Sequence, residues 1–328
     1  MVKTDRSRYE CGLECMRKRF LQYEYCGTGI VPAETPEALQ DGITIHEAIH
    51  DKLTGVESVA IANTEDAEKK ALLTAIVEGW AIIRLPKILE EYTILHIEQE
   101  IEVPLASDVT LMARCDVIVE RKVDGAKFVA NWKTFRQFDK YWHRRWAVDL
   151  QMQTEMIAAE YLLKEEVRGV HVEGLFKGIV RDDKLYHPLV YGYKSGTKLS
   201  YSYVAGWKHF PVWEEMDQIE WIRNAPLNIL ERSYVLSPPI LRDEARLEVV
   251  KNQIVAAEQK ISLDKLSHPC KNGFCEICWP QNTKSCYRMC CRPCSFVDIC
   301  HGSVVDPLAS GQFKIREPHH ECEKEEDI

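Results

Sequence analysis

Cysteines are the first residues whose type and spacing indicate chemistry. The chain of 328 residues has 13 of them. Nine lie between Cys270 and Cys322, three lie within the first 26 residues, and Cys115 stands alone in the middle. In a reducing compartment, where disulfides are rare, such crowding indicates ligation of a metal ion or an inorganic cluster.

A predicted β-hairpin brings a second set of chemical side chains together. Residues 109–121 alternate in the manner of a strand, Asp124-Gly125 is a favoured two-residue turn, and residues 126–135 form the return strand. With this turn, Asp116 lies opposite Lys133, and Asn131 shares their face because strand side chains alternate. The patch is either a surface Asp–Lys pair, worth at most about 1 kcal/mol, or part of a functional site.

Helices and strands on both sides of the hairpin must position these groups. Thr64 is the expected N-cap of a long helix that is interrupted near Pro86. The hydrophobic periodicity and the breaker residues predict the other bounds. We expect helices at 8–25, 46–53, 64–91, 139–164 and 242–260, strands at 93–104, 109–121 and 126–135, and a pair of strands around 169–191.

The composition is that of a globular protein. Hydrophobic residues make up 45% of the chain and charged residues 28%, which excludes a mainly disordered protein. No apolar run reaches the roughly 18–20 residues of a membrane span, and no secretory signal opens the chain. We therefore expect an intracellular, cytoplasmic protein with no membrane partner. The net charge of −9 is concentrated in the last residues, so it does not exclude a nucleic-acid partner.

The order of several segments resembles that of the PD-(D/E)XK nuclease superfamily. The likeness is to its RecB-like, iron–sulfur branch, which includes CRISPR-associated RecB-type exonucleases and related phage-encoded nucleases. The segments are ECMRKRFLQYEY, GITIHEAIH, ARCD, FVANWKT, DLQMQ and WPQNTKSC…CSFVDIC. The resemblance implies an α/β fold, with a restriction-endonuclease-like mixed sheet flanked by helices. It also implies a cysteine-rich iron–sulfur lobe formed by the N- and C-termini.

The resemblance also assigns roles to residues. It makes Asp116, Asn131, Lys133 and Gln151 the expected catalytic residues, and His46, Asp116 and Asn131 the ligands of Mg²⁺ or Mn²⁺. His50, one turn after His46, is an alternative ligand.

One position departs from the family, which has Asp or Glu where this chain has Asn131. A neutral amide offers an oxygen but no charge, so metal affinity and rate should both fall. Asn131 is then an engineered change, the mark of a pseudo-nuclease, or a natural variant whose second acid stands elsewhere. The candidates for that acid are Glu98, Glu100 and Glu120.

The resemblance further implies a [4Fe–4S] cluster held by four cysteines. Cys15 matches the ligand from the first helix, and Cys294 and Cys300 match the last two. The third of the C-terminal ligands is Cys286, which we favour, or Cys291. Such a cluster would join the two ends of the chain. The remaining cysteines could hold Zn²⁺ or be free thiols; they are Cys270, Cys275 and Cys278, with Cys290 or Cys291.

Basic and aromatic residues alternate in the segment KTFRQFDKYWHRRW, residues 133–146. Basic groups neutralise phosphates, and aromatic rings stack on unpaired bases. We expect the rings of Trp142 and Trp146 to point inward and anchor the helix. The residues expected to contact DNA are Arg136, Tyr141, Arg144 and Arg145.

Together these patterns give one hypothesis. Residues 1–265 would form the nuclease core, whose helix at 8–26 also joins the cluster lobe. Residues 266–303 would form the iron–sulfur segment, and residues 304–328 a disordered acidic tail. The expected activity is metal-dependent hydrolysis of DNA, exonucleolytic and directed at single strands or duplex ends. The alternative is a weakened or inactive pseudo-nuclease that acts as a DNA-binding or assembly component.

Overall fold

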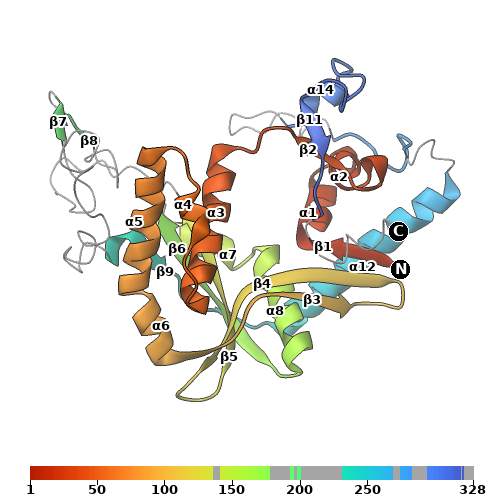
Figure 1. The fold of residues 1–328 in the computed structure, drawn as a ribbon. Helices are drawn as coiled ribbons and strands as arrows, with labels where there is room; N and C mark the ends of the chain where they lie inside the picture. Colours follow the sequence, from red (N-terminus) through yellow and green to blue (C-terminus); the bar gives the residue numbers. More distant parts are fainter. Residues whose placement is uncertain are drawn as a thin grey trace. The chain divides into compact units, whose positions relative to one another are not determined.

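The computed structural model describes residues 1–135, 141–177, 193–195, 198–200, 231–268, 274–282, 294–318 and 320. The chain divides into two compact units, and neither is continuous in sequence. Unit 1 comprises Met1–Pro36, Glu100–Arg114 and Asp243–Ile328. Unit 2 comprises Glu37–Gln99 and Cys115–Arg242. Figure 1 shows the elements of both units.

A mixed β-sheet forms the centre of unit 2. β4 and β5 are antiparallel, β5 and β6 are parallel, and β9 and β10 both run antiparallel to β6. β3 also pairs with β4. The strands are β3 (Tyr92–Pro104), β4 (Val109–Arg121), β5 (Lys127–Phe135), β6 (Val167–Phe176), β9 (Tyr234–Leu236) and β10 (Ile240–Leu241).

Helices flank this sheet (Figure 1), which confirms the predicted α/β class. Ile45 of α3 and Trp80 of α5 share one buried core with Trp132 of β5. α8 contacts β5 and β6. The helices of unit 2 are α3 (Glu37–Thr54), α4 (Val59–Ala62), α5 (Ala67–Ile83), α6 (Leu85–Glu91), α7 (Trp142–Trp146) and α8 (Leu150–Leu163).

Capping side chains decide where two of these helices begin. The Asp66 carboxylate accepts a hydrogen bond from the Lys69 amide at 2.7 Å, so the N-cap of α5 lies two residues after the predicted one, Thr64. The Asp149 carboxylate accepts from the Gln151 amide at 2.8 Å and begins α8. The single helix predicted at 139–164 is therefore two helices among the described residues.

The hairpin between β4 and β5 has a longer loop than predicted. Glu120 pairs with Lys127 and Val117 with Ala130. The Arg121 amide donates to the Ala126 carbonyl, so these two residues flank a loop of four residues, 122–125. The predicted opposition of Asp116 and Lys133 is thus wrong by two residues. Because strand side chains alternate with a period of two, this shift leaves Asp116, Asn131 and Lys133 on their predicted face.

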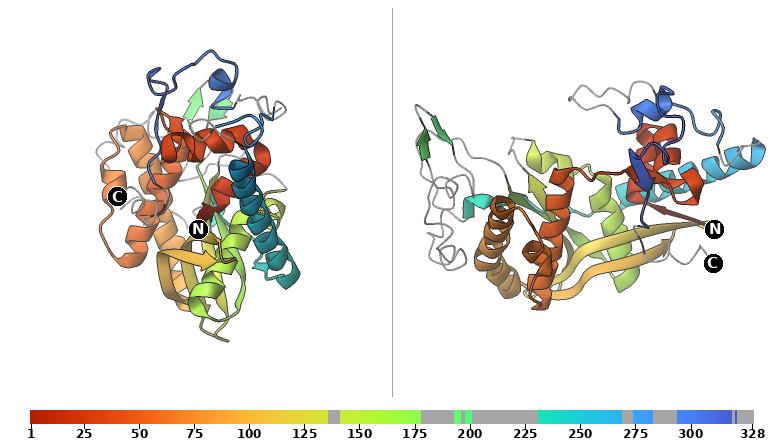
Figure 2. Two further views of the ribbon diagram at one scale, coloured as in Figure 1. Left: turned by 90° about the vertical axis from the view of Figure 1, so that its right-hand side faces the viewer. Right: turned by 45° about the horizontal axis from the view of Figure 1, so that its top comes forward.

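Unit 1 joins segments from the two halves of the chain. β1 (Val2–Asp5) runs parallel to the first part of β4, and β2 (Ile30–Pro32) pairs antiparallel with β11 (Phe313–Ile315). Figures 1 and 2 show α12 (Glu244–Ser267) beside α1 (Arg6–Glu14) and α2 (Met16–Tyr23). A buried ion pair between Arg19 of α2 and Glu258 of α12, with an N···O distance of 2.6 Å, links these helices.

Several bounds in unit 1 differ from the prediction. The helix expected at 8–25 breaks at Cys15, whose backbone is extended, and the last long helix continues to Ser267. The tail expected to be disordered from residue 304 contains β11, so that prediction is wrong for this part. The remaining elements of unit 1 are η1 (Tyr25–Gly27) and α14 (Val297–Cys300). Those of unit 2 are η3 (Glu231–Ser233) and two strands that pair with each other, β7 (Tyr193–Ser195) and β8 (Lys198–Ser200).

Among the described residues, no helix is both long enough and apolar enough to cross a bilayer.

Candidate metal centre

Three side chains of unit 2 bring potential metal ligands together. His46 of α3, Glu98 of β3 and Asp116 of β4 each offer one atom, and all three atoms lie within 4.8 Å of one another. His46 Nδ1 is 3.5 Å from Asp116 Oδ2. Oxygen ligands of Mg²⁺ or Ca²⁺ lie about 2.0–2.6 Å from the ion, so facing ligands are separated by about 4–5 Å. The spacing therefore fits one divalent cation.

At Asp116 a side chain takes over from the backbone pairing between β4 and β5. Val117 is the last residue of β4 paired with β5 in this direction, and the Trp132 amide then donates to Asp116 Oδ2 at 3.1 Å. The hydrogen bond fixes the Asp116 carboxylate, which is almost fully buried. The same oxygen, Oδ2, is the one that faces His46 Nδ1 at 3.5 Å.

Glu98 adopts an unusual backbone conformation, with φ = +47°. Non-glycine residues avoid this left-handed region, and such strain concentrates in functional sites. The conformation interrupts the strand alternation at the residue that contributes the third potential ligand.

A hydrogen-bonded chain of four side chains lies beside the metal ligands. Lys133 Nζ donates to Gln151 Oε1 at 2.9 Å, and Gln151 Nε2 donates to Glu155 Oε1 at 2.6 Å. Asn131 Nδ2 donates to both carboxylate oxygens of Glu155, each at 3.0 Å. The chain connects β5 to α8 and fixes the position of the Lys133 ammonium group.

Glu155 is the buried acid of this group. Its pKa is raised from 4.5 to about 8: burial raises it most and the nearby charge of Asp116 also raises it, while Lys133 and the hydrogen bonds from Gln151 and Asn131 lower it. Sequence reasoning missed Glu155. The signal was its position four residues after Gln151, on the same face of the helix.

The two polar atoms of the Asn131 side chain differ in their contacts. Nδ2 donates to Glu155, whereas Oδ1 has no hydrogen-bond partner among the described residues. Asn131 is 1% exposed. A buried carbonyl oxygen without a partner is unfavourable by about 1–3 kcal/mol. The open oxygen is therefore suited to a ligand such as a hard cation.

The alternative ligands considered from the sequence lie elsewhere. His50 contacts Asp51 and Glu120 pairs with Lys127, both outside the three-residue group. In unit 1, Glu100 contacts Arg114 and His320. Of the three carboxylates proposed to compensate for Asn131, the structure brings Glu98 alone into the group.

The basic and aromatic segment is partly described. Trp142 is buried, and its ring packs so closely that a Cβ atom on Gly174 would lie 2.5 Å from it. Tyr141 is 54% exposed, and Arg144 and Arg145 are exposed as predicted. The Lys133 Nζ atom lies 6.0 Å from the centre of the half-buried Trp146 ring. Arg136 is outside the described residues.

Four of the cysteines lie in the aromatic core of unit 1. Cys278 belongs to the buried core that includes Phe20 and Phe296, and Cys275, Cys294 and Cys300 pack against this core. Cys15 Sγ accepts a hydrogen bond from the Asn282 amide at 3.3 Å, which ties the break between α1 and α2 to the C-terminal segment. Cys15, Cys294 and Cys300 thus belong to one unit, while Cys286 and Cys291 are outside the described residues.

Cys275 and Cys278 form a turn in which the Cys278 amide donates to Cys275 Sγ at 3.3 Å. Amide hydrogen bonds stabilise a thiolate, the form in which cysteine binds metals. Cys270 and Cys290, the other proposed zinc ligands, are outside the described residues. Among the described residues, no group of three cysteines has the spacing of a single-ion site.

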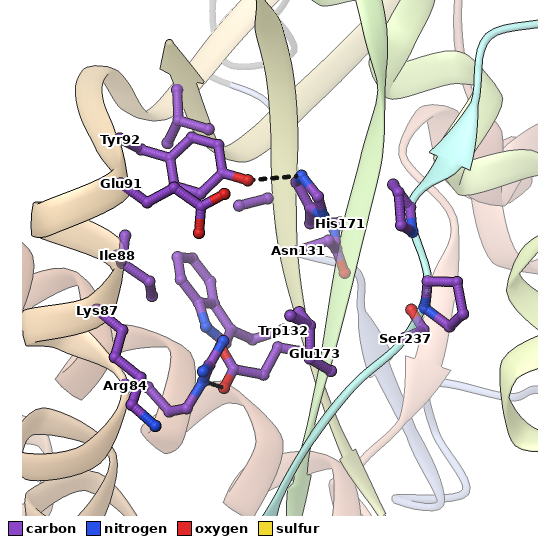
Figure 3. A pocket seen from close by; sticks show the side chains of 15 residues that line it. Arg84, Lys87, Ile88, Glu91, Tyr92, Asn131, Trp132, His171, Glu173 and Ser237 are labelled. Atoms are coloured by element: carbon purple, nitrogen blue, oxygen red, sulfur yellow. Dashed lines mark hydrogen bonds and ion pairs between the residues drawn. The ribbon is translucent and has the colours of Figure 1, made fainter. Parts of the chain in front are cut away.

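A hollow of about 430 Å³ also lies in unit 2, lined by residues of α6, β5 and β6. Figure 3 shows the Tyr92 hydroxyl turned toward His171 and the Arg84 guanidinium turned toward Glu173. Trp132 lines this hollow, whereas its neighbour Lys133 points to the other face. Asn131 also lines the hollow, whereas the three potential ligands and Lys133 do not.

No protein-family model matches the chain, and no curated protein matches it.

Proposed function

We propose that the chain is a divalent-metal-dependent DNA nuclease. The observation that supports this most strongly is the convergence of His46 from α3, Glu98 from β3 and Asp116 from β4 within 4.8 Å, where β4 is the neighbour of β5, which carries Lys133. One imidazole and two carboxylates suit Mn²⁺ and Mg²⁺, which prefer oxygen ligands and tolerate a histidine.

The chain's own residues would divide the work. His46, Glu98 and Asp116 would hold the cation, with the open oxygen of Asn131 as a further candidate ligand. A bound divalent cation lowers the pKa of water and neutralises the charge of a phosphate. The ammonium group of Lys133, held by Gln151, would stabilise the negative charge that develops on the phosphate.

DNA would approach along the exposed basic residues after β5. Arg144 and Arg145 are exposed and would contact phosphates, and the exposed ring of Tyr141 could stack on an unpaired base. Attack at ends and a preference for single strands rest on the resemblance to RecB-like nucleases alone. A location in the cytoplasm is likewise part of the proposal.

A [4Fe–4S] cluster would stabilise unit 1. Cys15, Cys294 and Cys300 line its aromatic core or its edge, and Cys286 would complete four thiolate ligands. Cys275 and Cys278 would join Cys270 in a Zn²⁺ site. Iron and zinc contents of protein purified without oxygen, compared with those of Cys15→Ser and Cys275→Ser, test the two assignments separately.

The test of the nuclease proposal is cleavage of end-labelled single-stranded and duplex DNA in Mg²⁺ or Mn²⁺. We expect cleavage that EDTA abolishes and that Asp116→Asn reduces by at least about 100-fold, as expected for a lost electrostatic contribution to the transition state. Glu120→Gln is the control, because this acid lies on the same strand but pairs with Lys127. Equal activity of Asp116→Asn and the original chain would contradict the proposal.

A DNA-binding pseudo-nuclease is the second candidate, and the amide at position 131 favours it. In that case the chain would bind DNA with a strong salt dependence, measured by fluorescence anisotropy, and cleave none in either metal. Arg144→Ala and Arg145→Ala would weaken this binding, whereas Asp116→Asn would leave it unchanged or strengthen it.

A further inference from the structure

An acid and an amide face each other between β5 and α8. Nδ2 of Asn131 is 3.0 Å from each carboxylate oxygen of Glu155, and both residues are at most 2% exposed. The residues are separated by 24 positions in sequence, so the fold alone brings them together. Residue 131 is an amide and not an acid, and this close contact places the carboxylate of Glu155 directly beside it.

The contact decides how the Asn131 amide is oriented. Both carboxyl oxygens of Glu155 accept a hydrogen bond from Nδ2, and within an amide group only the nitrogen donates. An amide turned the other way would lose both of these hydrogen bonds. Glu155 therefore keeps Nδ2 toward itself and leaves Oδ1, which is buried and has no partner among the described residues, for another group.

We propose that Asn131 and Glu155 form an exchanged amide–carboxylate pair, in which helix α8 supplies the acid that strand β5 lacks. Glu155 is a positioning residue, because it acts on the metal centre through the Asn131 amide. Through Gln151 the same carboxylate is also connected to Lys133. This inference deepens the proposed function and rests on it for the role of the cation.

The pair predicts that Asn131→Asp alone does not improve the site. It would place two carboxylates 3.0 Å apart in a buried position, where like charges repel strongly. Exchanging both residues, as Asn131→Asp with Glu155→Gln, keeps one acid and one amide of nearly the same size. The double variant therefore reverses the polarity of the pair without changing its charge.

The experiment compares four full-length proteins: the original chain, each single variant and the double variant. Mn²⁺ alone, without DNA, is titrated by calorimetry, and the thermal midpoint is measured in EDTA. We expect Glu155→Gln to lower Mn²⁺ affinity by about 10–100-fold, the usual effect of losing a residue that orients a ligand. The double variant should recover most of that affinity, and Asn131→Asp should lower the thermal midpoint.

The control is Glu160→Gln, which removes another acid of α8 that pairs with Arg242. It should change the thermal midpoint but not Mn²⁺ affinity. If Asn131→Asp fails to fold, the other three proteins still decide the question. The inference is overturned if Glu155→Gln binds Mn²⁺ as tightly as the original chain, or if the double variant binds no better than Glu155→Gln.

The two proposals fail in different ways. If the affinities follow the exchange but no protein cleaves DNA, the nuclease proposal fails and the pair stands. If the original chain and Glu155→Gln cleave DNA and bind Mn²⁺ equally well, the pair fails and the nuclease proposal stands.

Discussion

Glu98→Gln should stabilise the protein without metal while weakening its response to metal. The ligand oxygens of Glu98 and Asp116 lie within 4.8 Å of each other. Coulomb repulsion between two such charges is about 3.5 kcal/mol at an effective dielectric constant of 20 and about 0.9 kcal/mol in water. Because Glu98 is partly exposed, we expect the free energy of unfolding in EDTA to rise by roughly 1–3 kcal/mol.

Metal should reverse this order. A ligand at 100 times its dissociation constant stabilises the folded state by about 2.7 kcal/mol. The original chain should gain this amount in Mn²⁺, and the variant, with one charged ligand fewer, should gain much less. Urea unfolding followed by tryptophan fluorescence, in EDTA and over a series of Mn²⁺ concentrations, measures both effects.

Glu120→Gln provides the matched control, since it removes an acid from the adjacent strand that pairs with Lys127. It should lower stability slightly in EDTA and keep the full response to Mn²⁺. The reasoning would be refuted if Glu98→Gln destabilised the metal-free protein and responded to Mn²⁺ as strongly as the original chain.

Three further predictions concern the framework of the two units. Glu258→Ala leaves the buried Arg19 uncompensated and should lower the unfolding free energy by about 3–5 kcal/mol in urea titrations; a loss as small as that of Glu10→Ala, in the more exposed pair of Arg6 and Glu10, would contradict this. Gly174→Ala places a Cβ atom 2.5 Å from the Phe135 and Trp142 rings and should cost about 1–3 kcal/mol, with a shift in tryptophan emission; unchanged stability would show that the rings move freely. Burial lowers the pKa of His171 below its usual 6.5, so the folded state favours the neutral ring and stability should fall as pH drops below about 6.5. His171→Phe should flatten this acid limb of the stability curve, and an identical pH slope for both proteins would argue against it.

The sequence by itself determined which residue types stand on which strand face. Alternation placed Asp116, Asn131 and Lys133 on one side of the hairpin, and this survived a loop two residues longer than predicted, because a shift of two preserves the face. Helix periodicity and capping signals located most helices, although the caps at Asp66 and Asp149 required knowledge of the local hydrogen bonds.

Only the tertiary structure decided which residues make up the candidate metal centre. Glu98, Glu100 and Glu120 were equivalent candidates in sequence, and chain packing brings Glu98 alone within reach of His46 and Asp116. Glu155 acquires its role because the fold buries it against Asn131 and away from water. Ligand distances, burial and electrostatic coupling all arise between segments far apart in the chain, and local sequence patterns carry no information about such distances.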